Sequence, residues 1–199
     1  MTAKIKLNAA SGGGSFSLQA PSSSSNNRVF TLPDSADATL LTSTASLGKF
    51  ASYAIIGDQK ASGDNGGTFT SGAWRTRDIN TEFADDDNIV SISSNQFTLQ
   101  AGQYFLRASA PAYKANRHVI KLQNITDGIS SIGTTAYNGS SESVQGISNI
   151  STRFTIGAAK TFEIQHYGAN TEGTFGFGVA HDIGGFNSIY TLVEIFKEL

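Results

Sequence analysis

The feature that most constrains the fold is a change of pattern near residue 45. Residues up to about Thr44 are rich in Ser, Gly and Asn and carry only short apolar alternations, whereas strand-length alternations follow one another from Leu47 onward. A period of two places apolar side chains on one face of a β-strand. The first part has too few of them to fold alone, and the second has enough for a complete β domain. We therefore expect an N-terminal β arm over residues 1–46 and a β domain over residues 47–199.

The expected strands of the β domain recur about every ten residues, a spacing typical of a β-sandwich or barrel. No window shows a sustained apolar stripe of helical period, so helices should be nearly absent. The last expected strand is apolar on both faces, which indicates a mid-sheet strand with one face against another subunit. The expected strands are Phe50–Ile56, Thr68–Thr70, Trp74–Ile79, Ile89–Ser91, Phe97–Leu99, Gln103–Ala110, His118–Asn124, Ile129–Tyr137, Val144–Ile156, Thr161–Tyr167, Phe175–His181 and Ser188–Leu199.

The arm carries three short alternations, separated by Gly12–Gly14 and by the polar stretch Ser22–Asn27. The second and third alternations suggest a hairpin. An isolated two-stranded hairpin is marginal in water, so the arm should be disordered or should pair with other chains. A flexible linker is the alternative. The apolar residues expected to anchor the arm are Ile5, Leu7, Phe16, Leu18, Phe30 and Leu32.

Composition excludes several classes of function. The net charge is −2, only 15% of residues are charged, and Lys and Arg are scattered singly, so we expect no nucleic-acid partner. No apolar run approaches the roughly 20 residues of a membrane span. No apolar segment follows Lys4 and Lys6, so we expect no secretory signal and synthesis in a cytoplasm. The absence of cysteine rules out disulfides and thiol chemistry.

No catalytic motif stands out, and we expect neither an enzyme nor a cofactor or metal site. His118, His166 and His181 fall on separate expected strands without metal-ligand spacing. Asp85–Asp87 does not match a calcium loop and is interpreted as a solvated turn, with Ca²⁺ binding as the alternative. Trp74 is interpreted as half-buried packing, with sugar stacking as the alternative. Glycan hydrolysis would need two facing carboxylates, and no glutamate has a supporting pattern.

The segments AGQYFLRASAPAY and YTLVEIFKEL, with the strand series around them, resemble the C1q/TNF-like jelly roll over roughly residues 50–199. The resemblance implies an all-β jelly-roll sandwich that assembles as a homotrimer, with aromatic and aliphatic residues packed on the three-fold axis. The residues expected at the trimer interface are Tyr104, Leu106, Tyr190, Leu192 and Phe196.

The stretch IKLNAASGGGSFSLQAPSSSSNNRVFTLPDSADATLLTST, residues 5–44, is similar to segments of virion proteins of tailed phages, especially phages of cyanobacteria. Both resemblances together imply a trimeric phage virion structural protein. We expect a capsid decoration (cement) protein on the capsid exterior, whose arm clamps neighbouring copies of the major capsid protein. The alternative is a short tail fibre or knob head, attached to tail proteins, that binds a host surface glycan through exposed aromatics near Trp74, Tyr113 or Tyr137.

Overall fold

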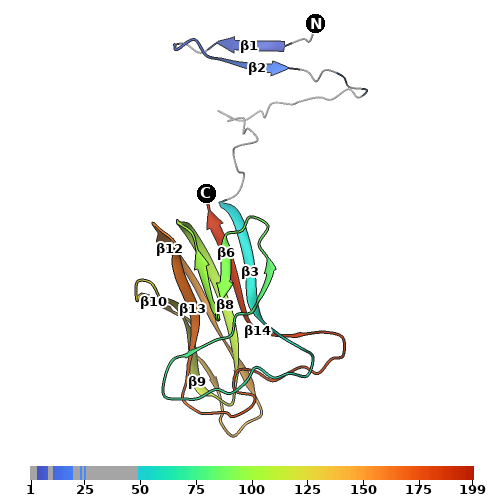
Figure 1. The fold of residues 1–199 in the computed structure, drawn as a ribbon, viewed down its shortest axis with the longest axis vertical. Coiled ribbons are helices and arrows are strands. Elements are labelled where there is room, and N and C mark those ends of the chain that lie inside the picture. The colour runs from blue at the N-terminus through green and yellow to red at the C-terminus, as the bar shows by residue number, and fades with distance from the viewer. Residues whose placement is uncertain (1–3, 9–10, 20–22, 24, 26–48) are drawn as a thin grey trace. The chain divides into compact units, whose positions relative to one another are not determined.

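The computed structural model of the chain describes residues 4–8, 11–19, 23, 25 and 49–199 (Figure 1). The chain divides into two compact units, Met1–Leu40 and Leu41–Leu199. The predicted boundary between residues 46 and 47 lies outside the described residues. Each unit is described by itself below.

The described part of the first unit is an antiparallel hairpin of β1 (Lys4–Asn8) and β2 (Ser15–Gln19). Ile5 lies opposite Leu18, so apolar positions of the two strands coincide. The backbone between them has φ = 85° at Gly12, a region that glycine enters without steric cost. The hairpin thus joins the first and second alternations of the arm, whereas the sequence suggested the second and third. The third alternation lies outside the described residues.

The second unit is a sandwich of two antiparallel sheets (Figure 1). One sheet has the order β12-β8-β14-β3-β5. The other has the order β10-β9-β13-β7-β6, with β11 also paired with β9 and β4 with β13. The strand bounds are β3 (Phe50–Lys60), β4 (Arg75–Thr76), β5 (Thr81–Ala84), β6 (Val90–Ser93), β7 (Gln96–Leu99), β8 (Gly102–Tyr113), β9 (Asn116–Asn124), β10 (Ser130–Ile132), β11 (Ala136–Asn138), β12 (Gln145–Ile156), β13 (Lys160–Gly168) and β14 (Ser188–Glu198).

Strands that are far apart in sequence lie side by side in both sheets. The pairs β3 with β14 and β7 with β13 are examples, and they give the chain the winding of a jelly roll. The predicted all-β jelly-roll sandwich is therefore confirmed. Within the described ranges no residue is helical, and no helix there is long and apolar enough to cross a membrane.

Two expected strands are absent. Phe175–His181 forms turns and loop, and Thr68–Thr70 contributes only an isolated bridge from Phe69 to Glu172. The alternation F-G-F-G has the period of a strand. Its glycines destabilise an extended strand, and the segment forms turns instead. Phe177 then packs against Phe69 with ring centroids 5.1 Å apart. The strand β5 was not expected from the sequence.

The hydrophobic core fills the space between the two sheets, and strand alternation supplies it. On β8, Tyr104 and Leu106 are fully buried between the sheets while Arg107 is exposed. On β9, Ile120 and Leu122 are buried in the same core. Each sheet therefore keeps a second face that points away from the core, and these outer faces carry the surface features described next.

Candidate functional site

The outer face of the five-stranded sheet carries a group of apolar side chains that the single chain leaves partly uncovered. We define the aromatic face by Phe50, Tyr53, Phe105, Leu192 and Phe196. Phe50 is 40% exposed and Tyr53 51% exposed. The ring centroid of Phe196 lies 5.2 Å from that of Phe50 and 6.1 Å from that of Phe105. Exposed apolar patches of this kind typically mark interaction surfaces.

Strand register brings these residues together. Phe196 on β14 lies opposite Tyr53 on β3 and opposite Phe105 on β8, so the three form one row across the sheet. Because Ala54 and Ile195 point into the core, their neighbours along each strand point outward. The aromatic row is at the end of the sandwich where β3 begins and β14 ends (Figure 1).

Charged side chains border the aromatic face. At its edge, Arg153 donates to both carboxylate oxygens of Glu198, over 2.7 and 2.8 Å. This hydrogen bonding holds the pKa of Glu198 below its ordinary value, so the carboxylate stays charged. Farther along the sheet, Arg107 lies 3.8 Å from Glu194, a partly exposed pair of small energetic weight. The outer surface of the five-stranded sheet is thus apolar around Phe196 and charged around the Arg107–Glu194 pair.

The sequence predicts Tyr104, Leu106 and Tyr190 at the trimer interface, and this role stays a prediction. The structure places all three side chains in the interior of the single chain. Tyr104 and Leu106 occupy the inward positions of β8. Tyr190 points inward because β14 has a bulge between Ile189 and Leu192, which reverses the alternation along this strand.

Leu192 and Phe196 are partly exposed on the outer side of β14, so another chain can reach both side chains. Their role at a trimer interface stays a prediction. Sequence reasoning missed Phe50, Tyr53 and Phe105 as members of the same surface. Their outward positions follow from the alternation of β3 and β8 once those strands are placed beside β14.

The predicted anchor residues of the arm fall into two groups. Ile5 and Leu7 lie on β1, and Phe16 and Leu18 lie on β2, in a register that pairs Leu7 with Phe16. Phe30 and Leu32 lie outside the described residues. The part that these residues take in anchoring stays a prediction.

Two of the three histidines meet inside the sandwich. Nδ1 of His118 on β9 lies 3.0 Å from Nε2 of His166 on β13, and both side chains are buried. Burial, with a smaller effect from the Arg77 charge, lowers the pKa of His118 to about 4 and that of His166 well below its ordinary value. The pair is therefore neutral at pH 7. His181 is exposed in a loop, where the expected strand is missing.

Arg77 is the largest fully buried side chain among the described residues, and sequence reasoning did not single it out. Its guanidinium donates to Thr191 Oγ1 over 2.9 Å, to the Pro111 carbonyl over 3.2 Å and to the Phe177 carbonyl over 2.9 Å. It also lies 4.2 Å from the centre of the Phe177 ring. Burial lowers the pKa of Arg77 to about 10, with the Asp58 charge opposing this effect. Arg77 joins both sheets and the loop that precedes β14.

The acidic run Asp85–Asp87 closes the turn between β5 and β6. The Asp85 carboxylate accepts hydrogen bonds from the backbone N–H groups of Ile89 and Val90 over 2.8 and 2.9 Å. Asp86 and Asp87 point to solvent. Within the described residues no three acidic or histidine side chains converge in a way that could hold a metal ion. Asp85 thus acts as a turn-forming residue.

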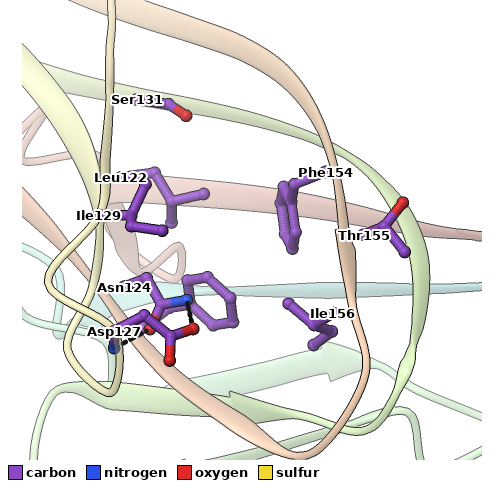
Figure 2. Close-up of a pocket in the computed structure, with 9 residues that line it drawn as sticks. Leu122, Asn124, Asp127, Ile129, Ser131, Phe154, Thr155 and Ile156 are labelled. Carbon is purple, nitrogen blue, oxygen red and sulfur yellow. Dashed lines mark hydrogen bonds between the residues drawn. The ribbon is translucent and has the colours of Figure 1, made fainter.

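A small pocket opens at the edge of the sandwich where β9 faces β12 (Figure 2). Figure 2 shows Leu122, Phe154 and Ile156 around it, with Asn124 and Asp127 hydrogen-bonded to each other at one side. Its volume is about 120 Å³. Sites for small molecules typically measure about 300–1,000 Å³, so this pocket is a gap at the margin of the core and too small for such a ligand.

Comparisons with known proteins concern the fold of the second unit. No protein-family description and no curated protein sequence matches the chain. Among solved structures, the globular domain of zebrafish complement 1qA aligns with 13% identity and a TM-score of 0.48, covering 73% of this chain and 96% of that one. Murine APRIL at pH 8.0 aligns with 8% identity and a TM-score of 0.44, covering 73% and 98%. At such identities no ligand or partner carries over to this chain.

Proposed function

We propose that the chain is a homotrimeric phage virion structural protein that decorates the capsid exterior. In this proposal three copies pack through their aromatic faces, and the N-terminal arm binds neighbouring copies of the major capsid protein. The function is mechanical: the trimer bridges shell subunits so that internal DNA pressure does not separate them.

The observation that carries the proposal is the aromatic face on a sandwich whose core is otherwise complete. Phe50 and Tyr53 remain substantially exposed in the single chain, although they stand beside Phe105 and Phe196. Permanent assemblies typically bury on the order of 2,000 Å² or more, and aromatic residues are enriched at the centre of such interfaces. Each Å² of apolar surface removed from water contributes about 25 cal/mol before entropy is subtracted.

The arm supports the second half of the proposal. The hairpin of β1 and β2 has two strands of five residues each, and two strands rarely form an independently stable unit. Its outer backbone N–H and C=O groups can be satisfied by adding to the sheet of another chain. The similarity of residues 5–44 to segments of phage virion proteins is the reason for choosing the capsid as the partner.

The test of assembly is Phe196→Asp in the full chain. We expect the variant to fold, because Phe196 lies outside the core, and to run as a monomer in light scattering, because a charge would enter an apolar interface. Phe186→Asp is the matched control, since Phe186 is 68% exposed in the loop before β14, whereas Phe196 lies near the far end of that strand, and it should leave the trimer intact. A Phe196→Asp protein that is still trimeric would contradict the aromatic face as the interface.

Placement on the virion is tested by labelling intact particles with an antibody against the body of the protein. Label over the shell supports the capsid decoration role. Label confined to the tail would instead support the alternative of a short tail fibre or knob head that binds a host glycan.

A further inference from the structure

The outer face of the other sheet has a hollow that the assembly proposed above does not use. It measures about 600 Å³ and is open to solvent. This volume falls in the range of about 300–1,000 Å³ typical of small-ligand sites. The described residues that line it include Arg117, Val119, Thr135, Tyr137, Tyr167 and Ala169.

Two tyrosines on different strands form its sides. Tyr137 on β11 lies opposite Arg117 on β9, and Tyr167 on β13 lies opposite Val119, two residues farther along β9. The tyrosines therefore stand on either side of β9, with Val119 between them. Tyr137 is 69% exposed and Tyr167 37% exposed. Ladder hydrogen bonds on both sides of β9 fix the positions of these strands, so the hollow is preformed.

A third aromatic ring extends this surface beyond Tyr167. The ring of Trp74 lies 5.7 Å from that of Tyr167, and the ammonium group of Lys121 lies 4.6 Å from the centre of the Trp74 ring. Trp74 is half-buried, as expected, and it packs directly against a tyrosine that lines the hollow. The aromatic surface is thus longer than a single sugar ring requires.

The polar groups around the hollow suit a hydroxylated ligand. The hydroxyl groups of Thr135, Tyr137 and Tyr167 have no hydrogen-bond partner among the described residues, and neither does the guanidinium of Arg117. A pyranose ring has C–H groups on its faces, which pack on aromatic rings, and hydroxyl groups around its edge, which need donors and acceptors. Flat apolar sides with polar groups at the margin match that division.

The charge of the hollow narrows the ligand class further. Arg117 is exposed, takes part in no salt bridge of the described structure, and is the one cationic side chain among the described lining residues. No acidic side chain lines the hollow. A guanidinium presents a planar pair of N–H donors that matches a carboxylate. The ligand should therefore carry a carboxylate beside the sugar ring.

We propose that the hollow between Tyr137 and Tyr167 binds an acidic saccharide, a uronic or sialic acid residue whose ring lies against the tyrosines and whose carboxylate meets Arg117. The site is on the sheet opposite the aromatic face, so contacts made through the aromatic face alone would leave it uncovered. The proposal stands independently of the capsid role.

The experiment is NMR titration of the full chain with matched acidic and neutral probes. These are digalacturonic acid against galactobiose of the same linkage, and 3′-sialyllactose against lactose. We expect a dissociation constant of about 1 mM for at least one acidic probe, the range that few contacts to a small ligand support. Its neutral counterpart should bind at least about tenfold more weakly.

Variants locate the binding. Tyr137→Ala should weaken acidic-probe binding at least about tenfold, and Arg117→Gln should remove the preference for the acidic probe. Phe186→Ala, an equally exposed aromatic outside the hollow, is the control and should bind as the wild type does. The proposal is overturned if neither acidic probe binds at 20-fold the expected dissociation constant, or if Tyr137→Ala binds unchanged. Equal binding of acidic and neutral probes overturns the assignment of Arg117.

Discussion

At the scale of single residues, the buried Arg77 links distant segments of the interior through three side-chain hydrogen bonds. It donates to two backbone carbonyls, on segments 34 and 100 residues away in sequence. A lysine cannot replace it, because a single ammonium group does not present donors in three fixed directions. The sequence pattern does not predict the burial of Arg77, since an arginine after a short strand ordinarily points to solvent.

We predict that Arg77→Met lowers the free energy of unfolding by about 3 kcal/mol, because the carbonyls of Pro111 and Phe177 lose their buried donor. Urea denaturation at fixed protein concentration measures the loss. Arg117→Met is the control, since an exposed arginine without a salt bridge should change the value by no more than about 0.5 kcal/mol. Equal midpoints for Arg77→Met and wild type would show that the buried guanidinium adds nothing.

At the scale of elements, the hairpin of β1 and β2 and the sandwich should have separate roles. We predict that deleting residues 1–44 leaves a folded trimer, because the core lies between strands that follow Lys49. Attachment to capsids should be lost. Circular dichroism and light scattering check the fold and the trimer, and co-sedimentation with undecorated shells checks attachment. Truncated protein that still sediments with shells would rule out the arm as the anchor.

Most strands were predictable from the sequence, because their period-two pattern is a local property. The long strands β8, β9, β12, β13 and β14 coincide with expected segments. Which strands pair with one another within each sheet was harder to predict from the sequence. The bulge in β14 moves Tyr190 into the core, and no local sequence pattern predicts this bulge. The hollow beside Tyr137 and the meeting of His118 with His166 depend on which strands become neighbours.

At the scale of the whole molecule, the buried histidine pair makes stability depend on pH. The folded chain keeps His118 and His166 neutral below pH 6.5, whereas the unfolded chain protonates them. Stability is therefore fully present above pH 6.5 and falls as the pH drops toward 4. For His118 alone, a pKa of about 4 against 6.5 corresponds to about 3 kcal/mol across that window.

Urea denaturation at pH 7.5, 6 and 5 tests this dependence. We predict that the free energy of unfolding decreases over this range, and that a double variant with His118→Gln and His166→Gln decreases much less. The range stops at pH 5 because carboxylates such as Glu198 lose their stabilising charge at lower pH. The same slope in wild type and double variant would assign the pH dependence to other groups.

The two outer surfaces of the sandwich belong to different sheets, and this separation has a consequence for avidity. A trimer joined through one sheet would present three copies of the opposite surface, each turned toward the medium. Each site would bind a single sugar weakly. A polymer long enough to reach several sites would bind to them together, and its apparent affinity can exceed that of one site by about a hundredfold or more. Particles carrying many such trimers would adhere to an acidic polysaccharide that a lone subunit hardly retains.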